Sequence, residues 1–166
     1  MPAVKSKNYK LWLAYGLSAV LLLLFQTAFM TRFPIHGVTP IIVPVCVAVA
    51  AVYEGPIPAA GFGLYCGLLL DASGSNDIWL YTVYLPLAGL GIGFIASYAR
   101  VIFFSCFVWS LAILIPVAMG QIFYYWLIRD GDPLLVLKIA AVQTVYSVIF
   151  AVPIRYWFGA IHKKFD

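Results

Sequence analysis

The wide spacing of the charged residues constrains this chain more than any other feature of its sequence. Six long segments contain no Asp, Glu, Lys or Arg: residues 11–31, 33–53, 55–70, 78–99, 101–128 and 139–154. An α-helix needs about 20 mostly apolar residues to cross the hydrocarbon core of a bilayer. Six such helices occupy about 120 residues, and a chain of 166 residues then has no room for a soluble domain.

Composition supports a membrane protein and excludes the other broad classes. The chain is 64% hydrophobic and only 10% charged, whereas soluble domains are about a quarter charged. A protein of this size cannot bury nearly all of its side chains. High hydrophobicity excludes a disordered chain, and three cysteines are too few for a disulfide scaffold.

The spans are predicted to be helices, because every backbone N–H and C=O group in lipid must be paired within the segment or within a closed barrel. A barrel needs alternating apolar and polar residues, and runs such as Leu21–Phe25 do not alternate. We therefore predict an all-α, polytopic membrane protein, a six-transmembrane-helix bundle that forms one domain over residues 1–166. The helices are expected at about residues 11–31, 38–53, 57–71, 78–98, 101–128 and 134–158.

Two features of these spans are expected from their lengths and charges. The helix over 57–71 is the shortest and is expected to be tucked among its neighbours. In the last helix, Lys138 and Arg155 are expected to extend outward from either end.

The distribution of Lys and Arg predicts the orientation in the membrane, because short cytoplasmic loops carry more of these residues. Six spans place both chain ends on one side, with Lys5, Lys7, Lys10, Arg100, Arg155, Lys163 and Lys164. The other side has only Arg32, Arg129 and Lys138. Both termini are therefore predicted to be cytoplasmic. This bias and attraction to anionic lipid headgroups explain the net charge of +4, and no basic stripe suggests nucleic acid binding.

No catalytic, metal or cofactor site is predicted. His36 and His162 are expected on opposite sides of the membrane, which excludes a metal site shared between them. The cysteines have no C-x-x-C spacing and are interpreted as buried apolar residues: Cys46, Cys66 and Cys106. Three amides inside spans are expected to form hydrogen bonds between helices: Gln26, Gln121 and Gln143.

Two acids stand at the ends of spans and are our candidates for contact with a partner. Asp71 ends the third span, where a functional acid and a simple helix-end acid are equally compatible with its position. Glu54 ends the second span just before Gly55, and a turn residue is favoured there over a contact residue. If they contact a partner, Asp71 does so on the outer side and Glu54 on the inner side.

Glycines four residues apart predict close packing of the third and fourth spans. Residues four apart share one face of a helix, and glycine on that face lets two backbones approach closely in lipid. The candidate helix-packing residues are Gly61, Gly63, Gly67, Gly89 and Gly93. Packing within the chain is favoured over packing against a partner.

The stretch from Glu54 to Asp71 resembles the rod-shape-determining protein MreD family. That family combines a Gly-Phe, Gly-Leu and Asp pattern in its third helix with a glycine-bearing fourth helix, and Gly61-Phe62, Gly67-Leu68 and Asp71 match it in this order. Length, six spans and cytoplasmic termini agree as well. The chain departs from the family after Pro40, where Ile41 replaces the Asp of a frequent Pro-Asp pair.

The resemblance implies a non-enzymatic scaffold of the cell-wall elongation machinery in the bacterial plasma membrane, with MreC and other membrane proteins of that machinery as partners. It also implies a bundle similar to the substrate-binding subunits of energy-coupling-factor vitamin transporters. Such a vitamin-binding subunit is the alternative function. It would need a pocket with converging polar groups. Such subunits often dock their partner through two alanines four residues apart in the first helix, and this chain has only Ala14 and Ser18 near that pattern, which counts against the alternative. An intramembrane enzyme is disfavoured, because no nucleophile–base or two-acid pair lies in the spans.

Overall fold

The chain forms helices in all six expected regions. The computed structural model describes residues 9–29, 32, 39–73, 80–98, 102–128 and 133–165, and these ranges contain no β-strand. The helices are α1 (Tyr9–Leu24), continued by the π-helical turn η1 (Phe25–Phe29), then α2 (Val43–Glu54), α3 (Pro56–Ala72), α4 (Leu80–Tyr98), α5 (Ile102–Ile128), α6 (Pro133–Ile149) and α7 (Ala151–Phe165).

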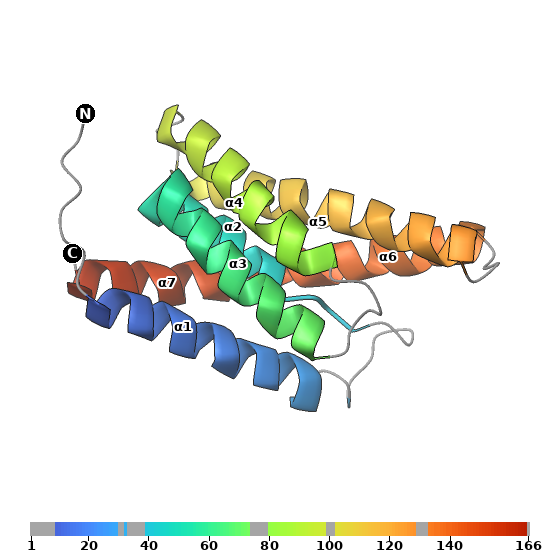
Figure 1. Cartoon of the computed structure of the whole chain (residues 1–166), viewed down its shortest axis with the longest axis horizontal. Coiled ribbons are helices and arrows are strands. Elements are labelled where there is room, and N and C mark those ends of the chain that lie inside the picture. Colours follow the sequence, from blue (N-terminus) through green and yellow to red (C-terminus); the bar gives the residue numbers. More distant parts are fainter. Residues whose placement is uncertain are drawn as a thin grey trace.

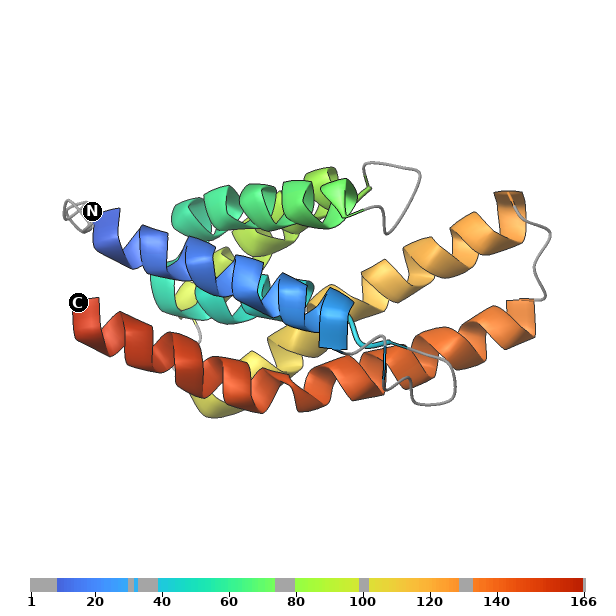
Figure 2. The same ribbon diagram turned by 90° about the horizontal axis from the view of Figure 1, so that it is seen from below.

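These helices make six antiparallel passes, the last of which is α6 and α7 together (Figure 1). Because the number of passes is even, the start of α1 and the end of α7 lie at the same end of the bundle, and the two helices lie side by side (Figure 2). Three described stretches are long and apolar enough to cross a membrane, namely Tyr9–Phe29, Leu80–Tyr98 and Leu134–Lys164. Shorter apolar helices cover Val43–Glu54, Pro56–Ala72 and Val108–Gly120. By length and composition, these helices are compatible with a multi-pass membrane protein.

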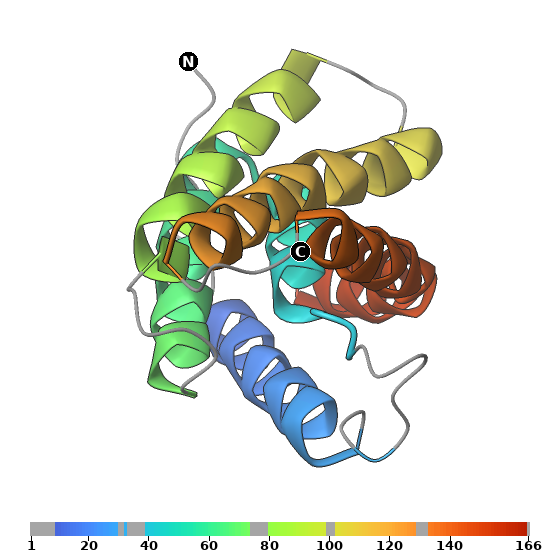
Figure 3. The same cartoon turned by 90° about the vertical axis from the view of Figure 1, so that its right-hand side faces the viewer.

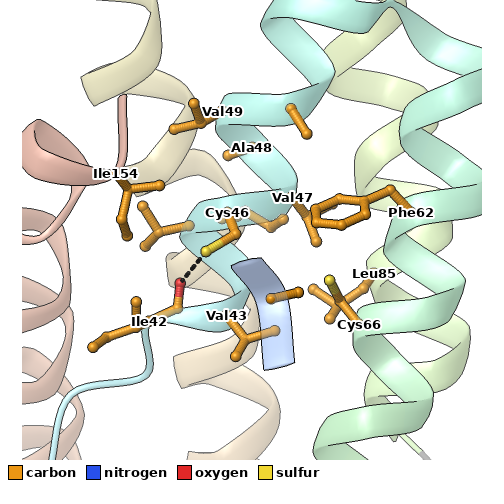
Figure 4. Packing of buried hydrophobic residues seen from close by; sticks show 14 of the residues in the cluster. Ile42, Val43, Cys46, Val47, Ala48, Val49, Phe62, Cys66, Leu85 and Ile154 are labelled. Carbon is orange, nitrogen blue, oxygen red and sulfur yellow. Dashed lines mark hydrogen bonds between the residues drawn. The ribbon is translucent and has the colours of Figure 1, made fainter. Parts of the chain in front are cut away.

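Helix α2 forms the centre of the bundle. Its residues from Val43 to Ala51 are all buried, and α1, α3, α4, α5 and α7 surround it when the molecule is viewed end-on (Figure 3). A helix that is apolar on every side is expected to be buried, and the small side chains of α2 let five neighbours approach its axis. Figure 4 shows this core, where Cys46 and Val47 lie near Phe62 of α3 and Ile154 of α7.

The shortest pass is therefore α2 and not α3, which corrects the sequence-based expectation. Helix α2 was expected to begin near residue 38, but it begins at Val43. A helix that began near residue 38 would need an N–H group at position 44 to donate to the carbonyl of residue 40, and Pro44 has none. With 12 residues it is about 18 Å long, well short of a hydrocarbon core of about 30 Å. The non-helical residues 39–42 bring the chain into the bundle before α2 begins.

The last pass is broken where a single helix was expected. A turn at Phe150 separates α6 from α7, and Pro153 explains it, because proline cannot donate to the carbonyl of Ile149 four residues earlier and its ring crowds that group. The helix then continues to Phe165 rather than ending at about residue 158. Arg155 consequently lies within α7 and is partly buried, instead of extending from a helix end.

The outer surface of the bundle is strongly apolar. Helix α1 exposes Leu13, Leu17, Leu21 and Leu24 on successive turns, each with more than half of its surface accessible. Helices α4, α6 and α7 expose large apolar side chains in the same way. Soluble monomers rarely expose continuous apolar surface on this scale, so a lipid environment fits this surface.

Candidate functional site

The candidate site is the pair of helices α3 and α4, which pack along more of their length than any other two described helices. Glycines make this contact possible. A methyl group built at Gly63 would lie 2.5 Å from the carbonyl oxygen of Leu85, and one at Gly67 would lie 2.6 Å from that of Tyr81. Such distances are shorter than van der Waals contact, so the backbones meet directly at both glycines. These positions are one helical turn apart on α3.

Helix α4 contributes two matching glycines at the other half of the contact. A methyl group at Gly89 would lie 2.7 Å from the carbonyl oxygen of Ala59, and one at Gly93 would lie 2.6 Å from the Cα atom of Pro56. Gly61 has no such role, because a methyl group there would meet nothing within 4 Å. The interface therefore contains four of the five glycines expected in it, and Gly61 faces away from α4.

Asp71 connects the C-terminal end of α3 to the N-terminal end of α4. Its Oδ2 atom accepts hydrogen bonds from the Thr82 backbone N–H at 2.7 Å and from the Thr82 hydroxyl at 2.5 Å, and its Oδ1 accepts from the Tyr81 N–H at 3.4 Å. The first N–H groups of a helix have no partner within the helix, and a carboxylate there also opposes the positive end of the helix dipole. Asp71, partly buried, thus caps α4 from the end of α3.

Glu54 lies at the opposite end of the pair and points into the bundle. Its side chain is 0% exposed, and its Oε1 atom lies 2.7 Å from Nδ1 of His162 on α7. The same oxygen accepts a hydrogen bond of 3.1 Å from the hydroxyl of Tyr15 on α1. Glu54 therefore joins α1, α2 and α7. Its carboxyl group is thus occupied by contacts within the chain, whereas the sequence left a turn residue and an inner-side partner contact open.

A cluster of aromatic rings that was not expected from the sequence surrounds Tyr15. The Tyr15 ring stacks on Phe158 of α7 with centroids 4.9 Å apart, and Phe62 of α3 lies 5.9 Å from Tyr15 and 6.1 Å from Phe158. Nearby, the Trp157 indole N–H donates a hydrogen bond of 3.2 Å to the hydroxyl of Ser18. The cluster joins three passes that are remote in sequence, so the spacing of residues within one helix does not predict it.

Two of the three amides that were expected within spans, Gln26 and Gln143, bind the non-helical segment 39–42. Gln26 accepts a hydrogen bond of 2.7 Å from the Ile42 N–H, and the Gln143 side chain donates one of 3.0 Å to the carbonyl of Thr39. Ser147 accepts a bond of 2.8 Å from the Ile41 N–H. Non-helical backbone at membrane depth is tolerated only where it is enclosed by protein or lines a water-filled cavity. Both amides therefore link passes, but they do so by hydrogen bonds to this backbone segment and not by bonds between side chains.

Other candidate residues are not brought together. Cys46 and Cys66 are buried and free, and within the described ranges no three His, Cys, Asp or Glu side chains come close enough to hold a metal ion. His36 lies outside the described residues, as do the side chains of Cys106 and Gln121.

No protein-family model matches this chain, and no curated protein or solved structure does so either. The site is therefore interpreted from its geometry and from the residues that compose it.

Proposed function

We propose that this chain is a non-enzymatic scaffold of the bacterial plasma membrane, of the type represented by the rod-shape-determining protein MreD. In this role it binds MreC, with both chain ends in the cytoplasm, and helps to couple cytoplasmic filaments to cell-wall synthesis. Its bundle is then similar to the substrate-binding subunits of energy-coupling-factor transporters. Other membrane proteins of the elongation machinery are further partners in this proposal.

One observation carries the proposal: the stretch that resembles the family, Glu54 to Asp71, contains most of α3, and α3 and α4 pack more extensively than any other two described helices. Gly63 and Gly67 press α3 against α4, Asp71 caps α4, and Glu54 joins the other end to α1 and α7. The acids thereby serve to hold helices together. A closely packed bundle with an apolar outer surface suits a protein that works by docking.

The vitamin-transporter alternative is disfavoured by the surroundings of Ala14 and Ser18. Ser18 is buried, donates to the Ala14 carbonyl at 2.7 Å and accepts from Trp157 of α7. This face of α1 packs against α7 of the same chain, so it is not available for docking of a transporter partner. We do not propose that function.

The test combines depletion with complementation in the native cell. Depletion is expected to convert rods to spheres, and wild-type protein carrying an affinity tag is expected to restore rods and to enrich MreC. Gly67→Ala, which pushes α3 from α4, is expected to restore shape poorly, whereas Gly91→Ala has nothing within 4 Å of the new methyl group and serves as the matched control. Unchanged cell shape after depletion, together with no enrichment of MreC, would refute the proposal.

A further inference from the structure

An open groove runs between α1 and α3 on the outer surface of the bundle, where the two helices lie side by side (Figure 1). Its volume is about 430 Å³, and its walls include Trp12, Leu13, Leu17 and Tyr65. This volume lies in the range of small-molecule sites in proteins, roughly 300–1,000 Å³. The lining is mostly apolar, so the groove suits a hydrocarbon chain.

Two glycines line this groove, and helix packing does not account for Gly61. Gly16 of α1 and Gly61 of α3 both line the groove, and a methyl group at Gly61 would meet nothing within 4 Å. Glycine within a helix costs about 1 kcal/mol relative to alanine, and no contact inside this chain requires it at this position. The missing side chain leaves room for a group that is not part of the chain.

A positive charge stands at one end of the groove. Lys10 precedes Leu13 by three residues and Leu17 by seven, so all three share one face of α1. Lys10 is exposed, as is Lys163 near the end of α7, at the same end of the bundle. A molecule seated along Leu13 and Leu17 therefore has its polar end beside the Lys10 ammonium group.

The positive charge of Lys10 distinguishes between two occupants of an apolar groove in a membrane, a helix of another protein and a lipid. A transmembrane helix of another protein carries Lys and Arg at its own cytoplasmic end, and these would repel Lys10 at the side where this chain concentrates its cations. An anionic phospholipid presents a negative phosphate at the same level and is attracted. The charge therefore complements a lipid and opposes a partner helix.

We propose that the α1–α3 groove is a binding site for one anionic phospholipid. An acyl chain lies against Leu13 and Leu17 in the space left by Gly16 and Gly61, and the phosphate is paired with Lys10. The site is independent of the scaffold function, because lipid binding requires neither MreC nor any other protein.

The test is native mass spectrometry of the full-length protein in detergent, titrated with phosphatidylglycerol and, in parallel, with phosphatidylcholine. We expect the wild-type chain to retain one phosphatidylglycerol molecule in preference to phosphatidylcholine. Gly61→Leu fills the groove and should weaken phosphatidylglycerol binding at least ten-fold. Gly91→Leu is the matched control, since Gly91 also has nothing within 4 Å and lies on α4, away from the groove.

A second variant tests the charge and remains informative even if Gly61→Leu does not fold. Lys10→Gln should weaken binding of phosphatidylglycerol about five-fold, which corresponds to the roughly 1 kcal/mol that one lysine contributes beside an anionic membrane surface, and should leave phosphatidylcholine unaffected. Lys163→Gln, at the same end but on α7, should have a smaller effect. Equal retention of both lipids by the wild type, or retention of phosphatidylglycerol unchanged by Gly61→Leu and Lys10→Gln, would overturn the proposal.

Discussion

At the scale of single residues, polar side chains within the bundle form hydrogen bonds with one another and with the backbone. Glu54 is the main example, because its buried carboxylate meets groups from two other passes, the hydroxyl of Tyr15 and the imidazole of His162. A buried charge is tolerated only when it is paired and hydrogen-bonded. The same logic explains why Gln26, Gln143 and Ser147 surround the non-helical segment 39–42.

Tyr15→Phe tests the contribution of the hydroxyl to this arrangement. It removes one hydrogen bond to a buried carboxylate and keeps the stacked ring, so the free energy of unfolding should fall by about 1.5–3 kcal/mol. The measurement is unfolding by sodium dodecyl sulfate in mixed micelles, followed by circular dichroism. Tyr98→Phe is the control, since Tyr98 is 79% exposed at the end of α4. Equal stability of the two variants would show that the Tyr15–Glu54 bond contributes nothing.

Ser147→Ala tests the support of the non-helical segment. Without the hydroxyl, the buried N–H of Ile41 loses its partner, and an unsatisfied buried donor costs about 1–3 kcal/mol. Hydrogen exchange should also become faster at Ile41. Ser97→Ala is the matched control, because that exposed hydroxyl bonds only to the Phe94 carbonyl in its own helix. Unchanged exchange at Ile41 would contradict the assigned role.

At the scale of helices, the α3–α4 pair shows which part of the site the sequence could reveal. Spacing by four residues placed Gly63 and Gly67 on one face, and the structure presses that face against α4. Gly61 is two residues from Gly63 and therefore on a different face, so a cluster of glycines in the sequence does not define one interface. Spacing identifies a shared face, whereas only packing decides which face meets a neighbour.

Gly67→Ala tests how much the close approach of α3 and α4 contributes to the stability of the protein. The new methyl group would lie 2.6 Å from a backbone oxygen of Tyr81, so α3 and α4 must separate, and overpacking of this kind typically costs about 1–3 kcal/mol. Gly91→Ala adds the same methyl group where nothing lies within 4 Å and should leave stability unchanged or raise it slightly, because alanine favours helix. Thermal unfolding in detergent compares the two, and a Gly67→Ala protein as stable as Gly91→Ala would contradict the interface.

The break between α6 and α7 also depends on tertiary structure. Pro153 was present in the sequence, but the apolar run around it suggested one continuous helix. A proline within a membrane helix either bends it or ends it, depending on whether neighbours satisfy the freed carbonyl. The neighbours are a property of the tertiary structure, so the turn at Phe150 was not predictable from the run alone.

At the scale of the whole molecule, the number of passes decides where the chain ends lie. Helix α1 begins and α7 ends at one end of the bundle, which follows from an even number of passes (Figure 2). The bias of Lys and Arg predicts that this end faces the cytoplasm.

Accessibility of introduced cysteines tests this arrangement. In a chain whose native cysteines are replaced by alanine, Tyr9→Cys and Lys164→Cys should both react with a membrane-impermeant thiol reagent in inverted vesicles, and neither should react in intact spheroplasts. A cysteine introduced at Thr39, which is only partly buried but lies within the bundle, serves as a poorly reactive reference. Labelling of the two ends from opposite sides would exclude six passes.

The sequence by itself determined that this chain is helical and suited to a membrane, because long uncharged apolar segments can satisfy their backbone in lipid only as helices. It also determined approximately where each pass lies, since charges are too costly to place within the hydrocarbon. Tertiary structure alone decided that α2 is the buried centre, that Glu54 turns inward to Tyr15 and His162, and that Gly61 opens a groove. Each of these depends on contacts between residues remote in the chain, and local spacing does not encode which surfaces meet.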